Sequence, residues 1–245
     1  MKRKIFYGAF LTLVVLVVVF WEEVPIIASP FPTKFIGNHT VATRLQQFGV
    51  VARERWKPHF AHAQTAYPPS SVILVGLKDD KILEVYATSL AREVRFVRVF
   101  SICATSGVTG PKLLEGDLQL PEGIYKVSFL NPNSAYHVSL RLDYPNAFDR
   151  AKGATDGRGN LGGDIMIHGK CVSIGCLAMR DEPAEDLFVL AADIGIGNVK
   201  IILAPFDLRL REPTRELYEQ MPGWAPELYE QIRVELQKLP RNEES

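Results

Sequence analysis

The stretch Ile165–Met179, IMIHGKCVSIGCLAM, places one histidine and two cysteines within nine positions of a chain that has only three cysteines. These residue types suit a zinc site, a disulfide, or a cysteine nucleophile with its base. Structural zinc takes four ligands, commonly from closely spaced cysteine pairs. Cys171 and Cys176 are five positions apart, and a fourth ligand would have to come from elsewhere. The spacing disfavours zinc, and the compartment bears on the other two choices.

The N-terminus carries the pattern of an export segment. Residues 1–4 include three positive charges, residues 5–21 are uncharged, and two glutamates follow. This arrangement predicts a cytoplasmic N-terminus with the rest of the chain exported. The 17-residue apolar run is near the lower limit of a spanning helix and longer than a typical signal-peptide core. We therefore expect residues 1–22 to form an uncleaved anchor; cleavage after the poor site Ile26-Ile27-Ala28 is the alternative.

An exported chain meets an oxidising compartment, where paired cysteines form disulfides. Three cysteines then fit one bridge and one free thiol. Pairing of Cys171 with Cys176 and pairing of Cys171 with Cys103 both remain open. For Cys103 we expect a core or disulfide position and no catalytic role.

Composition limits the class of protein. The formal net charge is zero and no basic stripe is present, which argues against nucleic acid as a partner. A linker and helical lead-in are expected over residues 23–69, and a helical extension over 206–245. Short β-branched runs between them predict a sheet; they are SVILVGL, ILEVYATS, VRFVRVFSI, IYKVSFL, YHVSLRL and VKIILAP. The glycine-rich segment 144–163 predicts a long loop that acts as a lid or binding segment.

Within the opening stretch, a nucleophile explains the most residue types. His168 ends a short strand, and Gly169 permits an abrupt turn after it. Ser173 can hydrogen-bond either the backbone or the imidazole. Gly175 lets the chain approach a substrate, and backbone N–H groups at Gly175 and Cys176 can face a developing oxyanion. Cys176 is then the nucleophile, His168 its general base, and an activated thiol should alkylate readily near neutral pH.

The segment HGKCVSIGCLAM resembles the active-site motif of the L,D-transpeptidase catalytic domain (YkuD-like) family, in which His-Gly and a spacer precede Ser-x-Gly-Cys. The segments GPKLLEGDLQLPEGIYKV, LNPNSAYHVSL and YPNAFDR resemble a Gram-negative branch of it, so the likeness covers residues 70–205. It implies an α+β fold, a β-rich sandwich with flanking helices, here preceded by the membrane helix. It also implies a periplasmic enzyme that attacks peptidoglycan stem peptides through a cysteine thioester, with no metal or organic cofactor.

One departure from the family pattern leaves the reaction open. Many members carry arginine two positions after the cysteine, where this chain has Ala178. Chains with alanine there resemble hydrolytic members, including an amidase that releases a lipoprotein from peptidoglycan. The alternatives to a transferase are therefore a hydrolase of the same fold and a non-catalytic cell-wall binding module. For the hydrolase, peptidoglycan-attached lipoprotein would be a further partner.

Other polar residues are weaker candidates. Gly169, Arg158 and Lys170 are expected to contribute to substrate binding, where the two cations, like Arg150 and Lys152, would meet stem-peptide carboxylates. For each cation alone, a solvated surface charge is the simpler interpretation. His137 lies on an alternating strand, where a half-buried packing role is favoured over a second base.

Overall fold

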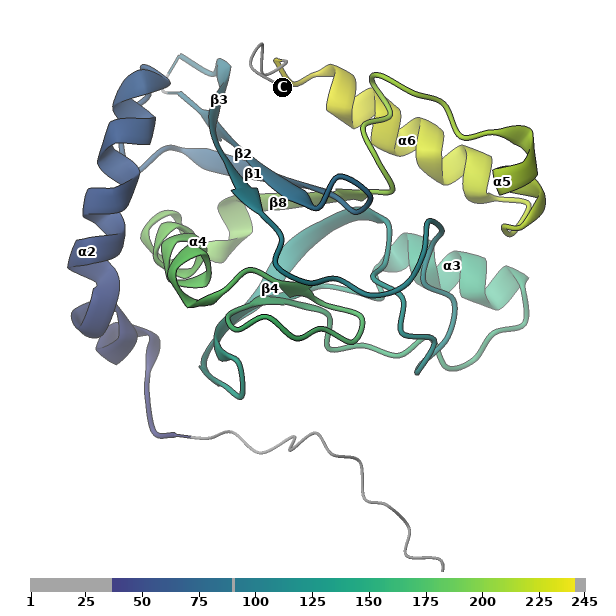
Figure 1. Ribbon diagram of the computed structural model, residues 1–245, viewed down its shortest axis with the longest axis horizontal. Helices are drawn as coiled ribbons and strands as arrows, with labels where there is room; N and C mark the ends of the chain where they lie inside the picture. The colour runs from purple at the N-terminus through teal and green to yellow at the C-terminus, as the bar shows by residue number, and fades with distance from the viewer. Residues whose placement is uncertain (1–36, 90, 241–245) are drawn as a thin grey trace, which may run out of the picture. The chain divides into compact units, whose positions relative to one another are not determined.

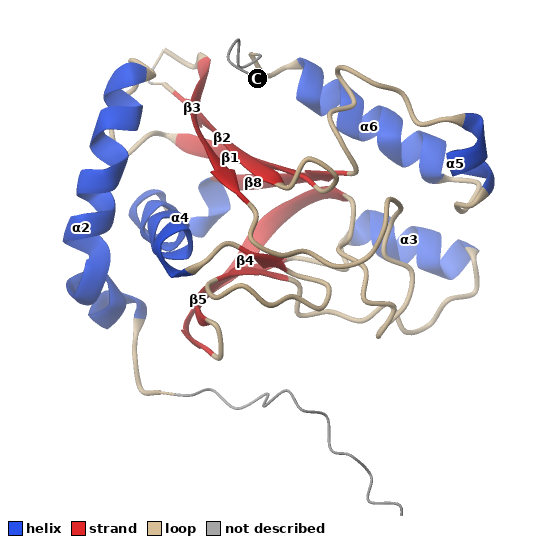
Figure 2. Cartoon of the chain, in the orientation of Figure 1, coloured by secondary structure: helices blue, strands red, loops and turns tan. Residues whose placement is uncertain are grey.

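The computed structural model describes residues 37–89 and 91–240. Figures 1 and 2 show helices on both sides of a central sheet. The elements in chain order are α2 (Val41–His62), β1 (Ser71–Leu77), β2 (Ile82–Thr88), β3 (Val94–Ser101), β4 (Gly123–Ser134), β5 (His137–Leu142), α3 (Ala147–Thr155), β6 (Met166–His168), β7 (Leu177–Ala178), α4 (Asp181–Ile194), the short 3₁₀ helix η1 (Ile196–Asn198), β8 (Val199–Ala204), α5 (Arg215–Glu219) and α6 (Ala225–Gln237).

The strands form one mixed sheet in the order β3-β2-β1-β8-β4-β5-β6-β7. Strand β4 joins its two halves, because residues 123–126 pair with β8 and residues 127–134 pair with β5. Beyond β3, Ala104 pairs with Ala178 of β7, which brings the two ends of the sheet together. The predicted α+β class is confirmed, and β7 lies where the two ends of the sheet meet.

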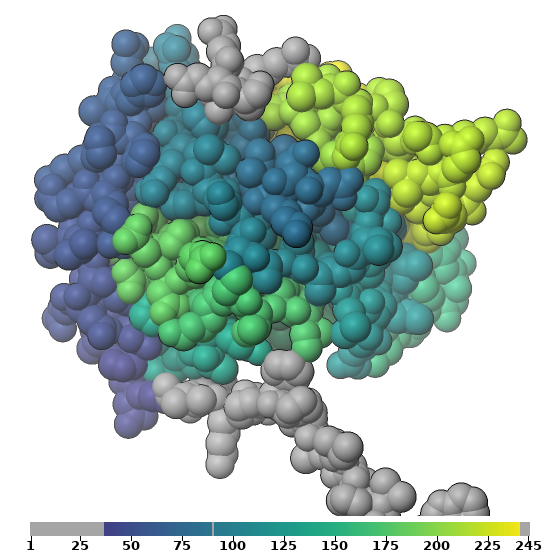
Figure 3. Space-filling model, in the orientation of Figure 1, coloured from purple at the N-terminus to yellow at the C-terminus, as the bar shows by residue number. Residues whose placement is uncertain are grey.

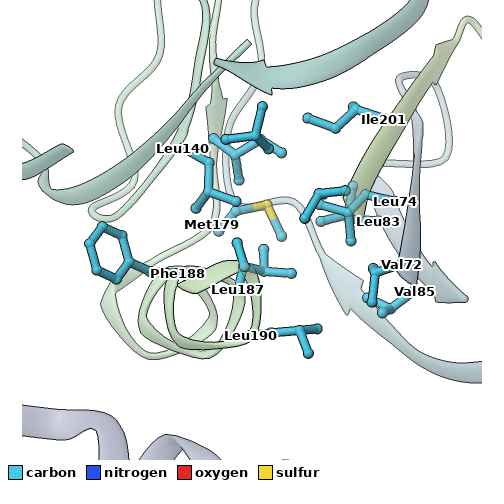
Figure 4. Packing of buried hydrophobic residues seen from close by; sticks show 14 of the residues in the cluster. Val72, Leu74, Leu83, Val85, Leu140, Met179, Leu187, Phe188, Leu190 and Ile201 are labelled. Atoms are coloured by element: carbon cyan, nitrogen blue, oxygen red, sulfur yellow. The ribbon is translucent and has the colours of Figure 1, made fainter. Parts of the chain in front are cut away.

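A dry core fills the space between the two halves of the sheet. Leu140 and Met179, from the half that carries the short strands, lie opposite Leu74 and Leu83 of the other half (Figure 4). Phe188 and other α4 residues close the same cluster. Since all of these side chains are almost completely buried, the core fixes β6 and β7 against the rest of the domain.

Helix α2 packs on the same core through a stripe at four-residue spacing, Phe48, Ala52, Trp56 and Phe60. Thr40 caps its N-terminus by accepting a hydrogen bond from the Thr43 backbone N–H. On the opposite face, α6 buries a second cluster against β1 and β8. In Figure 3 these flanking helices border a surface on which the chain after β3 (teal) and the chain around β7 and α4 (green) meet.

The prediction of a continuous loop over residues 144–163 is wrong in its first half. Residues 147–155 form helix α3, whose N-cap is Asn146. The Asn146 side chain accepts from the backbone N–H groups of Phe148 and Asp149, and the Asp149 carboxylate accepts from the Asn146 N–H. This reciprocal capping box satisfies the free donors of the first turn. The remainder, from Asp156 to Asp164, is the loop that leads to the site.

The predicted membrane anchor, residues 1–22, lies outside the described residues. Within them, no helix is both long enough and apolar enough to cross a bilayer.

Candidate active site

His168 and Cys176 lie on neighbouring strands and on one face of the sheet. Strand β6 pairs in parallel with β7, with Ile167 beside Leu177 and His168 beside Ala178. Cys176 directly precedes β7, two residues before Ala178, so it shares the face of His168. The sheet therefore brings the predicted base and the predicted nucleophile to one place.

Residues 169–175 connect His168 to Cys176. Two glycines and one disulfide fix the path of this connection. A Cβ atom on Gly169 would lie 2.6 Å from the Tyr136 carbonyl oxygen and 2.6 Å from Asp181 Oδ1, so only glycine fits there. Gly175 has φ +85°, a conformation that favours glycine. Between them, Cys171 forms a disulfide with Cys103, with 5.4 Å between the Cα atoms.

The disulfide decides between the two pairings that the sequence leaves open. Cys103 is the partner of Cys171, and Cys176 is a free thiol. The expectation of one bridge and one free cysteine is confirmed, and a Cys171–Cys176 bridge is excluded. The sulfur of Cys176 is therefore available for chemistry.

The imidazole of His168 is held in the orientation that a general base needs. Its Nδ1 lies 2.6 Å from the Gly169 carbonyl oxygen, which makes Nδ1 the donor and leaves Nε2 as the proton acceptor. The Tyr136 ring stacks on the imidazole with 4.6 Å between centroids. Burial lowers the pKa of His168, partly offset by the bond to Gly169. The ring is thus neutral at pH 7, and a backbone carbonyl holds its Nδ1.

The thiol of Cys176 is also neutral in this state, which differs from the expectation of a thiol already activated at neutral pH. Burial raises its pKa to about 11, and a hydrogen bond with the Met166 backbone lowers it only in part. The sulfur donates weakly to the Asp164 carbonyl oxygen at 3.7 Å. Among the described residues, no hydrogen bond joins it to His168. The sulfur of Cys176 therefore carries its proton at neutral pH in this state.

The two backbone N–H groups predicted to bind an oxyanion, those of Gly175 and Cys176, donate hydrogen bonds to serine hydroxyl groups. Ser173 Oγ accepts from the Cys176 N–H at 3.1 Å and donates to the Cys176 carbonyl oxygen at 2.6 Å. Ser173 thus uses the backbone alternative and does not touch His168. The Gly175 N–H donates to Ser106 Oγ at 2.5 Å, and Ser106 Oγ donates to the Leu118 carbonyl oxygen. A substrate oxyanion would have to displace these hydroxyl groups to use either N–H.

Ser106 is a site residue that the sequence did not predict. It lies in the loop after β3, 69 positions from Gly175. The signal for Ser106 in the sequence is its position three residues after Cys103 in FSICATSG, and the sequence leaves the disulfide partner of Cys103 open. Once Cys103 is bonded to Cys171, Ser106 follows into the site.

A cavity of about 140 Å³ lies at Gly175, the residue before Cys176, and Cys176 itself is not among the lining residues. Lys112, Leu118, Asp164 and Ile174 line it, together with the backbone of Gly175 and other glycines. Lys112 has a barely exposed side chain that binds Asp117 and the Leu114 carbonyl oxygen, so it organises the loop. A larger cleft of about 670 Å³, near Lys126, Phe148 and Lys200, contains none of the predicted site residues.

The two cations predicted to bind substrate, Arg158 and Lys170, do not line the 140 Å³ cavity. Arg158 donates to the Leu113 carbonyl oxygen and pairs with Asp156. Lys170 forms an exposed pair with Asp181, with 2.7 Å between Nζ and Oδ2. Their role in substrate binding stays a prediction.

His137 takes the packing role expected for it. Its Nε2 lies 2.8 Å from Glu185 Oε1 on α4, and its ring lies against Phe48.

Alkylation tests the neutral thiol directly. In the folded protein, the rate with iodoacetamide is expected to rise about tenfold per pH unit up to about pH 11, because only the thiolate reacts. The disulfide leaves Cys176 as the single thiol that can react. The guanidinium-unfolded, unreduced protein is the control, and its rate should level off near pH 8.5. A plateau below pH 8 in the folded protein would contradict the neutral pair.

Comparisons with known proteins agree with this geometry. The family model of the L,D-transpeptidase catalytic domain (YkuD) matches residues 70–201, including the complete site turn. YafK of Escherichia coli (strain K12), provisionally named an L,D-transpeptidase, is 32% identical over 164 residues. The alignment covers 65% of this chain and 64% of YafK, so the chain spans a little under two thirds of that relative.

Two solved structures also match parts of the chain. The helical cell shape determining protein Pgp2 from Campylobacter jejuni is 27% identical with a TM-score of 0.43, over 54% of this chain and 47% of Pgp2. Bd1075 of Bdellovibrio bacteriovorus is 17% identical with a TM-score of 0.42, over 71% of this chain and 56% of Bd1075. The family match covers more than half of the described domain and contains both His168 and Cys176, and so the chain belongs to the L,D-transpeptidase catalytic domain family.

Proposed function

We propose that this protein is a cysteine acyltransferase that acts on peptidoglycan stem peptides through a thioester at Cys176. The observation that supports the proposal is a free thiol at Cys176, just before the strand that pairs with that of His168, together with an imidazole whose Nδ1 bonds a backbone carbonyl and whose Nε2 is left to accept a proton. Family membership supports the substrate class. The cavity at Gly175 and Asp164 offers room for a substrate group.

The reaction follows from these groups. As the sulfur attacks the carbonyl carbon of an amide, its proton passes to His168 Nε2. The carbon–nitrogen bond then breaks, and the imidazolium protonates the leaving amine. A second amine attacks the thioester carbon and gives its proton to His168. The carbon–sulfur bond then breaks as the new amide forms, and the proton returns to sulfur to restore the thiol. The Gly175 and Cys176 N–H groups stabilise both tetrahedral oxyanions once the hydroxyls of Ser106 and Ser173 have moved aside.

Hydrolysis is the second candidate, favoured by Ala178. This residue is completely buried on the face of His168 and leaves no charged side chain at that position to hold an amine acceptor. Water would then resolve the thioester, and the product would be a shortened stem or a released lipoprotein.

The same proposal includes the location. An anchored periplasmic enzyme would meet peptidoglycan, and the Cys103–Cys171 disulfide supports an oxidising compartment.

The test incubates the detergent-solubilised full chain with purified sacculi, with and without attached lipoprotein, and identifies products by mass spectrometry. New cross-links identify a transferase, whereas shortened stems or free lipoprotein identify a hydrolase. The Cys176→Ala variant should lose at least ~10³-fold of either activity. A product pattern unchanged by this substitution would exclude Cys176 chemistry, and binding to sacculi without any product would favour a cell-wall binding module.

A further inference from the structure

Arg141 lies on the active-site face of the sheet, one strand beyond Met166. It pairs with Met166 across β5 and β6. Met166 is the residue that the β6–β7 register places beside Cys176, since Ile167 lies beside Leu177. Paired residues project from the same face of a sheet. The sheet thus sets Arg141, Met166 and Cys176 side by side in one row.

The guanidinium of Arg141 is accessible and weakly engaged. Its side chain is 45% exposed, and Nη2 lies 3.0 Å from Asp164 Oδ1, whose own side chain is 75% exposed. Exposed pairs of this kind contribute little to stability. A ligand carboxylate can therefore replace or share Asp164 at small cost, with the two parallel hydrogen bonds that a guanidinium offers.

Asp164 connects this guanidinium to the nucleophile. Its backbone carbonyl oxygen accepts the weak hydrogen bond from the Cys176 thiol, and Asp164 also lines the 140 Å³ cavity. A group that binds Arg141 is then held next to a substrate carbonyl positioned for attack. The other cations near the cavity are less available in the described structure, because Lys112 and Arg158 are already bound by carboxylates and backbone carbonyls.

We propose that Arg141 is a specificity-determining residue that binds a free carboxylate of the substrate adjacent to the scissile amide. The inference rests on the proposed function, and it names the chemical class that the site selects: a peptide with an anionic group beside the bond attacked. Ala178 on β7 carries no charge. In this proposal Arg141 supplies the cation from β5, which lies two strands from β7 in the sheet.

The experiment compares two synthetic stem peptides that differ only in whether their carboxylates are free or amidated, with kcat and KM measured for each. Wild-type protein should prefer the free acid by about ten- to hundredfold in kcat/KM, the range for one charge-assisted hydrogen-bonded pair. Arg141→Gln should lose this preference, mainly through a higher KM for the free acid. Its kcat/KM for the amidated peptide should stay near the wild-type value.

Two further variants separate recognition from structure. Arg95→Gln is the matched control, because Arg95 is also a strand arginine, 48% exposed and paired with an exposed carboxylate, on β3. It should keep the wild-type preference. Asp164→Asn removes the partner but tolerates the left-handed conformation of that residue (φ +54°). It should also keep the preference, since the guanidinium remains.

The outcomes are distinct for the two proposals. If wild-type protein converts neither peptide and leaves sacculi unchanged, the proposed function fails. If it converts both equally, or if Arg141→Gln keeps the preference, the proposed function stands and the role of Arg141 is wrong. Loss of the preference in Asp164→Asn to the same extent as in Arg141→Gln would also overturn that role, because it would show that the pair acts only by holding the loop.

Discussion

His168→Asn should lower kcat/KM by about 10³-fold at pH 7, within the range of ~10²–10⁴ for removal of a general base. Asparagine can keep the hydrogen bond to the Gly169 carbonyl oxygen through its amide nitrogen, in the place of Nδ1. It has no equivalent of Nε2. The variant therefore removes the proton acceptor with little change to the turn, and the unfolding midpoint in urea should stay close to that of the wild type.

The pH dependence identifies the mechanism behind this loss. Burial lowers the pKa of His168 from its usual value of 6.5, so the midpoint of the acid fall in wild-type kcat/KM, where the imidazole becomes protonated, should lie below pH 6.5. The thiol pKa of about 11 means that thiolate forms without a base only at high pH. The deficit of His168→Asn should therefore shrink as the pH rises from 7 towards 10. A deficit of less than tenfold, or one independent of pH, would show that His168 is not the base.

The motif and most strands could be predicted because their signals are local. The nearly continuous apolar runs of β1 and β8 indicate two covered faces, and the spacing of His168 and Cys176 fits a strand, a turn and a second strand. Helix α3 was missed because the surrounding glycines dominate the composition of residues 144–163. Its start depends on two residues, Asn146 and Asp149, whose mutual hydrogen bonds outweigh that composition.

The protonation state of the site could not be predicted from the motif. Whether Cys176 is a thiol or a thiolate depends on how much water the fold removes from it, and that burial comes from segments distant in sequence. The partner of Cys171 and the contact of Ser106 with Gly175 have the same origin. Residue types thus indicate which groups react, whereas tertiary packing sets their charge and their hydrogen-bond partners.

Removal of the disulfide by a Cys103→Ser/Cys171→Ser double substitution should destabilise the domain by roughly 4 kcal/mol, because the bridge closes a loop with a sequence separation of 68. That is a large part of the ~5–15 kcal/mol typical of a folded protein. Activity should fall as well, under conditions where the variant is still folded. The disulfide holds the middle of the turn between His168 and Cys176, and it brings the loop of Ser106 to Gly175.

Urea unfolding gives the stability change, and kcat/KM of the folded fraction gives the effect on the site. Cys176→Ala is the matched control, since it removes a cysteine from the same turn but leaves the bridge intact. It should unfold near the wild-type midpoint although it is inactive. Wild-type protein treated with a reductant should reproduce both effects of the double substitution, and reoxidation should reverse them. If the double variant kept its midpoint and its kcat/KM, the turn would be held by its remaining contacts, chiefly the close packing at Gly169 and the hydroxyl groups of Ser106 and Ser173.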